Sequence, residues 1–288
     1  MSLAVLIIVL GIVFLMNTKK KNRELKHQKK QIELKNSELN TKNEEIQAQS
    51  EYLQEANAEL LAKNEEISAQ RDELHTQNIK IEQQSHQIIS SIQYAKRIQE
   101  AVLPEDENLI EVLPSHFVYF HPRDIVSGDF YWVKQIQNYI FVAVADCTGH
   151  GVPGAFMSML GTAFLNEITG QGEIMKPSEI LNALREKVKK SLKQTGKTGE
   201  AKDGMDMVLV RIDLESQELI FSGAHNSIVH LRTNSETNQP ELTYLKGDKM
   251  PIGIGRKEDS FNDQITPLQP NDMIYLYTDG YIDQFGGP

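Results

Sequence analysis

The feature that most restricts the fold is an unbroken heptad repeat in the N-terminal part of the chain. Leucine or isoleucine occupies every seventh position from Leu25 to Ile88, and no glycine or proline lies between Gly11 and Pro104. Such a segment can form one continuous helix, about 95 Å long between Leu25 and Ile88 at 1.5 Å per residue. With these residues at d positions, most a positions hold asparagine, serine or arginine. This pattern favours a parallel, in-register homodimer of modest stability.

An apolar run precedes the repeat. Residues 3–16 read LAVLIIVLGIVFLM, and residues 17–30 carry a cluster of lysines with Glu24 as their only acid. The run is shorter than the roughly 20 residues that span a bilayer, but its basic flank fits the positive-inside pattern. We therefore interpret residues 1–18 as a truncated membrane anchor, which would hold the catalytic part on the cytoplasmic side of the cell inner membrane. The alternative is a short buried helix or an apolar terminus.

Composition excludes several classes of function. The formal net charge of -10 argues against a nucleic-acid partner, because nucleic-acid-binding domains present a basic face. The single cysteine, Cys147, excludes an internal disulfide and a cysteine-rich zinc site, and it is consistent with a reducing compartment. The eight histidines show no paired metal-binding spacing, so a structural zinc is not expected.

The chain changes character after the stalk formed by residues 19–88. Residues 89–103 have a wider apolar face, so they are expected to form a junction helix that packs against the next domain and transmits regulation. Residues 104–288 show short apolar runs that predict strands at 139–145, 207–212, 218–221, 228–232 and 273–277. Helices are predicted at 154–169 and 177–194, and a mobile loop at 195–203. The pattern indicates an α+β domain, two-layered or a sandwich, with mostly antiparallel sheet.

Three aspartates share one kind of local context. Asp129 lies in SGDFYW, Asp146 ends the run YIFVAVAD, and Asp279 ends MIYLYTD, each with a glycine close by. Carboxylates at strand ends beside flexible glycines can aim oxygen ligands into one cleft. Oxygen ligands suit Mg²⁺ or Mn²⁺, and two such ions can generate a hydroxide for displacement at phosphorus. Any one aspartate could instead be a turn or capping residue, but the shared context favours a metal centre.

Several motifs in fixed order extend this hypothesis: SGDFYW, ADCTGHGVPGAFMSMLG, DGMDMVLVRID, SGAHNS, PIGIG and IYLYTDGYID, led by YAKRIQEAVLP. Residues 89–288 thereby resemble SpoIIE-type phosphatases of the protein phosphatase 2C (PPM) superfamily. The resemblance implies a β-sandwich flanked by helices, with two divalent cations, Mn²⁺ or Mg²⁺, bound by Asp129, Asp146, Asp279 and the backbone carbonyl of Cys147. It also implies that metal-activated water hydrolyses phosphoserine or phosphothreonine on a regulator protein of the anti-sigma-factor-antagonist type.

The end of the chain departs from this resemblance. Relatives continue to a C-terminal Asp-Asp motif that supplies another metal ligand, whereas this sequence stops at Pro288. We therefore expect residues 104–288 to be a phosphatase domain that lacks its C-terminal end, and this piece could be inactive.

Four other features are weaker candidates. His150 is a candidate general acid, the alternative being a turn histidine bonded to the backbone. Arg123 could bind phosphate or could be an ordinary surface arginine. Asp206 could support the cleft or bind an extra metal. The pair His225-Asn226 is expected to stabilise a turn.

Two other functions stay open on the sequence alone. A two-metal nucleotide cyclase also uses strand-end aspartates after a coiled coil, but no glycine-rich phosphate loop precedes a lysine here. A degenerate phosphatase could serve as a phosphoprotein-binding scaffold. A sensor kinase built on His86 is disfavoured, because no ATP-binding motifs follow it.

Overall fold

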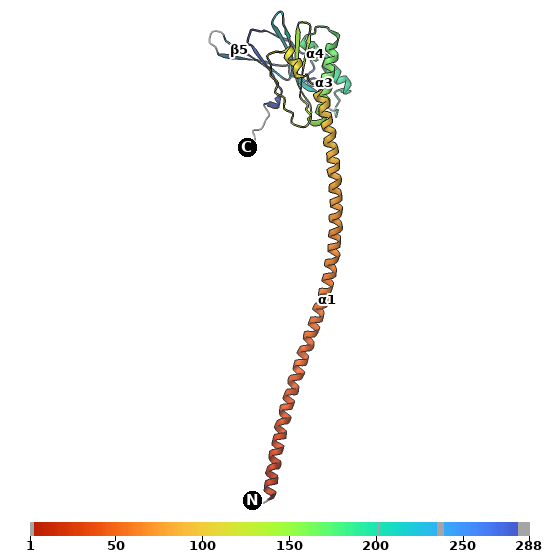
Figure 1. The fold of residues 1–288 in the computed structure, drawn as a ribbon, viewed down its shortest axis with the longest axis vertical. Coiled ribbons are helices and arrows are strands. Elements are labelled where there is room, and N and C mark those ends of the chain that lie inside the picture. The colour runs from red at the N-terminus through yellow and green to blue at the C-terminus, as the bar shows by residue number, and fades with distance from the viewer. Residues whose placement is uncertain (1–2, 198, 201, 235–238, 282–288) are drawn as a thin grey trace. The chain divides into compact units, whose positions relative to one another are not determined.

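Figure 1 shows the computed structural model of the chain, which describes residues 3–197, 199–200, 202–234 and 239–281. The chain divides into two compact units, Met1–Gln83 and Gln84–Pro288. The helix α1 (Leu3–Glu100) makes up the described part of the first unit and continues into the second. The predicted uninterrupted helix is therefore confirmed.

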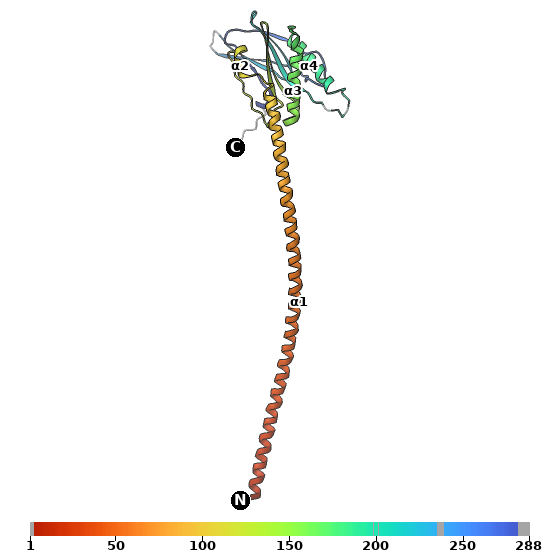
Figure 2. The same cartoon turned by 45° about the vertical axis from the view of Figure 1, so that its right-hand side comes forward.

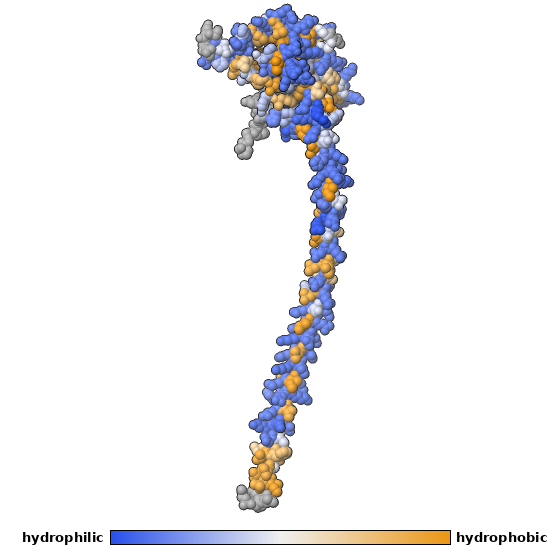
Figure 3. Space-filling view, in the orientation of Figure 1, coloured by the Kyte–Doolittle hydropathy of each residue, from blue (hydrophilic) through white to orange (hydrophobic). Residues whose placement is uncertain are grey.

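The apolar residues of the heptad repeat lie on the surface of α1. Leu25 and Leu53 are each 59% exposed and Ile88 is 60% exposed. Figure 3 shows apolar residues at intervals along an otherwise hydrophilic helix. The parallel dimer, the coiled-coil pairing and the domain limits given above stay predictions.

The start of α1 contains the apolar run, which the lysine cluster follows within the same helix. In the part of the chain that the structure describes, no helix has the apolar length needed to cross a membrane. The prediction of a transmembrane anchor at residues 1–18 therefore finds no support.

The second unit is an α+β domain, which confirms the predicted fold class. Its described residues form two antiparallel sheets, with strand orders β1-β2-β3-β4-β7 and β6-β5-β8. The larger sheet consists of β1 (Phe130–Ile136), β2 (Tyr139–Cys147), β3 (Met205–Asp213), β4 (Glu218–Ala224) and β7 (Gln264–Pro267). The smaller sheet consists of β5 (Ile228–Thr233), β6 (Pro240–Leu245) and β8 (Met273–Leu276).

The larger sheet is covered on both faces. Successive side chains of a strand point to opposite sides, so alternate residues belong to two different cores. Phe141, Ala143 and Ala145 of β2 lie in one core with residues of the long helices, such as Leu165 and Leu184. The alternate residues of β2, including Val142 and Val144, pack in a second core with residues of the smaller sheet. The domain is therefore a sandwich of two sheets with a helical layer on the outer face of the larger one.

The helical layer consists of α3 (Gly151–Ile168) and α4 (Pro177–Ser191), which Figure 2 shows side by side along the strands. Shorter helices are α2 (Asp106–Val112), η1 (Thr169–Gln171) and η2 (Asp279–Tyr281). The five predicted strands and both predicted long helices are present within a few residues of their expected limits. The sequence analysis missed β1, β6, β7 and α2.

Candidate active site

One end of the larger sheet carries a row of acidic side chains. Asp146 in β2 is paired directly with Asp206 in β3, so both side chains lie on the same face. Phe130 is paired with Ala145, so the same register brings Asp129, one residue before β1, to the same end of the sheet. Asp146 alternates with residues of the helix-covered core, so its row lies on the face that the smaller sheet covers.

Asp279 begins η2, which follows β8 of the smaller sheet by a short connection. Burial, then the proximity of Asp129 and of Asp279, raises the pKa of Asp146 to about 8. Burial is also the main cause that raises the pKa of Asp206, with Asp279 adding to the effect and His225 opposing it. The structure therefore brings the three predicted aspartates and Asp206 together at one edge of the sandwich. The role of the three as metal ligands stays a prediction.

These residues suit a hard divalent cation in donor type and in charge. Their donors are oxygens, the ligands that Mg²⁺ and Mn²⁺ prefer, and a bound cation would offset both the burial and the carboxylate repulsion that raise the pKa of Asp146. Within the described residues, no three His, Cys, Asp or Glu side chains lie close enough together to hold a metal ion. The carboxylates would therefore have to draw closer around a cation.

Close backbone packing positions the segment before Asp129. A Cβ atom on Gly128 would lie 2.8 Å from the carbonyl oxygen of Gly149 and 3.3 Å from that of Cys147, so only glycine fits without movement. The carboxylate of Asp129 accepts a hydrogen bond of 2.8 Å from the Thr278 hydroxyl, which precedes Asp279. Asp129 is thus held between the turn after β2 and the segment after β8.

The side chain of Cys147 lies in the hydrophobic core and is 3% exposed. Burial, followed by Asp146 and Asp129, raises the pKa of this thiol well above its usual value, so it stays protonated. The thiol is enclosed in this core, so the proposed contribution of this residue is limited to its backbone carbonyl.

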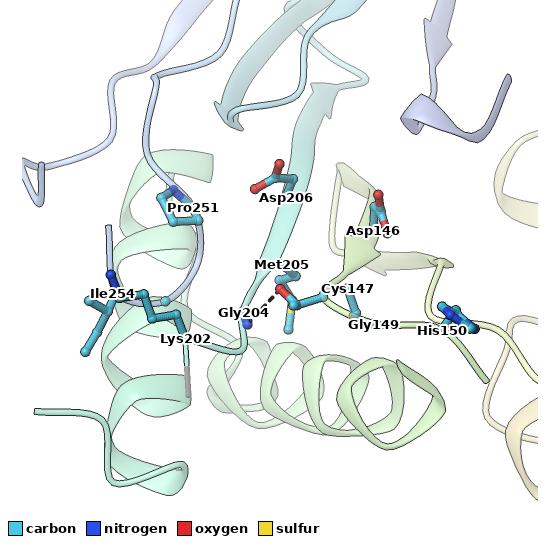
Figure 4. A pocket seen from close by; sticks show the side chains of 12 residues that line it. Asp146, Cys147, Gly149, His150, Lys202, Gly204, Met205, Asp206, Pro251 and Ile254 are labelled. Carbon is cyan, nitrogen blue, oxygen red and sulfur yellow. Dashed lines mark hydrogen bonds between the residues drawn. The ribbon is translucent and has the colours of Figure 1, made fainter. Parts of the chain in front are cut away.

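A cavity of about 320 Å³ opens beside Asp146 and Asp206 (Figure 4). His150 and Lys202 also line this cavity, and Figure 4 shows them on opposite sides of the two aspartates. Pro251 and other residues of the PIGIG motif complete the wall near Lys202. The cavity can therefore admit a group next to the acidic row and offers it one lysine ammonium.

The weaker candidates fall in different places. His150 reaches the cavity, and its Nδ1 atom lies 2.9 Å from an oxygen of Asp124, so its partner is a carboxylate and not the backbone. Arg123 is exposed and does not line the cavity. Asp206 lies in the acidic row itself. His225, expected only to stabilise a turn, has its Nδ1 atom 3.4 Å from Oδ2 of Asp206.

The last turn of α1 is connected to the same region. Gln99 is buried, and its Nε2 atom donates to the carbonyl oxygen of Ser127 (2.6 Å) and to Oγ of Ser158 in α3 (2.7 Å). The amide oxygen of Gln99 accepts a hydrogen bond of 3.0 Å from the backbone N–H of Ser127. Because Ser127 lies two residues before Asp129, Gln99 ties the end of α1 to the start of the acidic row.

Comparison with known proteins agrees with this geometry. The sequence profile of the family described as Stage II sporulation protein E (SpoIIE) matches residues 137–287. The chain is similar to the SiaA-PP2C domain of Pseudomonas aeruginosa, with 34% identity and a TM-score of 0.61, over 71% of this chain and 76% of that one. Comparison with curated proteins gave no match.

Two other solved structures are more distant. The RsbU and RsbW domains of a Mycobacterium tuberculosis protein show 21% identity and a TM-score of 0.45, over 58% of this chain and 42% of that one. The PP2C phosphatase domain of Bacillus subtilis SpoIIE, solved with a fragment of its regulatory domain, shows 20% identity and a TM-score of 0.42, over 54% and 41% of the two chains.

The sandwich with an acidic edge and the similarity to the SiaA domain define a PP2C-like protein phosphatase of a signalling system. Within that class, the chain belongs to the SpoIIE family, which confirms the resemblance drawn from its motifs.

Proposed function

We propose that this chain is a divalent-cation-dependent serine/threonine phosphatase that acts on a phosphorylated regulator protein in bacterial signalling. The observation that carries the proposal is the meeting of Asp129, Asp146 and Asp279 at one edge of a SpoIIE-family domain. In this proposal their carboxylates hold the cations, and the backbone carbonyl of Cys147 adds a ligand. Two bound Mn²⁺ or Mg²⁺ ions would supply an activated water and the positive charge that an in-line displacement at phosphorus requires.

Other residues of the chain contribute binding and proton transfer. The cavity beside Asp146 has room for a phosphorylated side chain, and Lys202 on its wall can attract the phosphate. His150 reaches the same cavity and is held by Asp124, so it is the candidate to give a proton to the departing serine or threonine oxygen. The wall of the cavity thus offers Lys202 to the phosphate and His150 to the serine or threonine oxygen that departs.

The proposal includes regulation through α1. A parallel homodimer through the heptads would join two phosphatase domains, and the helix at residues 89–102 would transmit changes of the stalk to the catalytic domain. The contacts of Gln99 with Ser127 and Ser158 support this route, because they connect that helix to the segment before Asp129. The single cysteine is consistent with a cytoplasmic location for the domain.

Hydrolysis of a phosphoserine protein and of p-nitrophenyl phosphate by the full chain tests the proposal. We expect activity with Mn²⁺ or Mg²⁺, its loss with EDTA, and a decrease of at least about 100-fold in Asp146→Asn. The matched change Asp72→Asn, on the exposed stalk, serves as the control.

Two results would contradict this assignment. Turnover of ATP without phosphatase activity would favour a nucleotide cyclase. Binding of a phosphoprotein without hydrolysis under any metal condition would favour a scaffold.

A further inference from the structure

The acidic row continues into the turn after β4. Met207 in β3 is paired with Ala224, the last residue of β4. His225, which follows Ala224, therefore lies beside Asp206. Asp206 is in turn paired with Asp146. His225 therefore lies at the same end of the sheet as the aspartates. It follows β4 in the position that corresponds to the aspartates of the first three strands.

The backbone at His225 has a conformation that few non-glycine residues adopt. Its φ angle is 58°, in the left-handed region. The turn is held on both sides, because the N–H of His225 donates to the carbonyl oxygen of Asp248 (2.8 Å) and the carbonyl oxygen of Asn226 packs closely against Gly223 and Gly247. A Cβ atom added to either glycine would collide with this carbonyl oxygen. The imidazole takes no part in these contacts, so stabilisation of the turn does not explain a histidine here.

The imidazole is directed at Asp206. Its Nδ1 atom lies 3.4 Å from Oδ2 of Asp206, and the two side chains are 44% and 39% exposed. Among the described residues, no other basic side chain pairs with Asp206, whereas the carboxylate of Asp279 repels its charge. Asp206 also lines the cavity next to Asp146. His225 is therefore the described basic side chain in a position to fix the orientation of this carboxylate.

We propose that His225 is a positioning residue that holds the carboxylate of Asp206 at the cation-binding edge, where Asp206 helps to bind a divalent cation. This inference rests on the proposed function and adds two residues to its site. A partner that orients a ligating group from outside typically contributes 10- to 100-fold to metal affinity.

Two substitutions separate the imidazole from the backbone. His225→Gly keeps the left-handed turn and removes the side chain, and His225→Asn also tolerates this conformation while offering an amide nitrogen close to the position of Nδ1. The measurement is the Kd for Mn²⁺ by calorimetry on the full chain. We expect His225→Gly to weaken binding by about 10- to 100-fold and His225→Asn to restore most of the affinity. The Tm without metal should not fall in either variant.

A double-mutant cycle with Asp206→Asn tests whether His225 acts through Asp206. In that background His225→Gly should weaken Mn²⁺ binding by less than about 2-fold. The inference is overturned if His225→Gly binds Mn²⁺ like the wild type, if it costs as much in the Asp206→Asn background, or if the wild type binds no Mn²⁺. A wild type that binds Mn²⁺ but hydrolyses no phosphoester would refute the proposed function alone, because the affinities still decide the role of His225.

Discussion

Replacing Gln99 by leucine should destabilise the catalytic domain although the two side chains are similar in size. Gln99 and Ser127 are 7% and 6% exposed, and leucine cannot pair with the N–H and the carbonyl oxygen of Ser127. Each unpaired buried group costs about 1–3 kcal/mol. Ser158 keeps a hydrogen bond of 2.9 Å to the carbonyl oxygen of Ala155, and its hydroxyl also lies 3.4 Å from the carbonyl oxygen of Ser127, so it partly replaces Gln99 there. The expected loss in the free energy of unfolding is therefore about 2–4 kcal/mol.

The single tryptophan provides the assay. Trp132 lies in β1 and is 3% exposed, so its fluorescence reports unfolding of the domain and not of the stalk. In urea titrations Gln99→Leu should lose the stability given above, and its Tm should fall by roughly 5–15 °C for a unit of this size. Gln93→Leu makes the same change on the exposed side of the helix and should stay within about 0.5 kcal/mol of the wild type. Equal effects of the two substitutions would refute the idea that Gln99 holds the segment before Asp129.

Three other expectations concern the acidic row and the stalk. The pKa of Asp146 rises from 3.8 to about 8 on folding, so its stabilising contribution to the metal-free domain is lost as the pH rises from about 4 through 8. In urea titrations with EDTA, Asp146→Asn should flatten this pH dependence of the free energy of unfolding. Gly128→Ala should cost about 1–3 kcal/mol and weaken Mn²⁺ binding, because its Cβ atom would lie 2.8 Å from the carbonyl oxygen of Gly149, whereas Gly170→Ala, with open space around it, should not. Insertion of four residues near Leu74 breaks the heptad phase and should change phosphatase turnover without changing Mn²⁺ affinity; unchanged turnover would remove the stalk from regulation.

Local patterns predicted the elements that are long or buried. The stalk could be predicted because every seventh residue repeats without a helix breaker, and β2 and β3 because strands buried on two faces read as continuous apolar runs. The strand β6 is exposed along nearly its whole length, and β7 has four residues with none buried. Such edge strands are stabilised by pairing with a neighbour, which leaves little trace in their own sequence.

The three aspartates of the acidic row could be singled out from the sequence, but the arrangement of the residues around them could not. The glycine context identified Asp129, Asp146 and Asp279, since a turn at a strand end has a local signature. The relation of Asp206 to His225 has no local signature, because it arises from strand pairing between distant segments. Gln99 was missed for the same reason, since its partners Ser127 and Ser158 belong to other elements.

Strand register links the apolar core to the acidic row. Ala145 and Cys147, on either side of Asp146, face the helix-covered core, so a slip of one residue in β2 would turn Asp146 into that core. The slip is resisted by residues that would leave the same core, such as Phe141, whose burial contributes about 1.5–3 kcal/mol. Repulsion within the row acts only at the strand ends, where a bound cation can offset it. A sheet buried on both faces can therefore hold a cluster of charges at the ends of its strands, which an exposed hairpin could not.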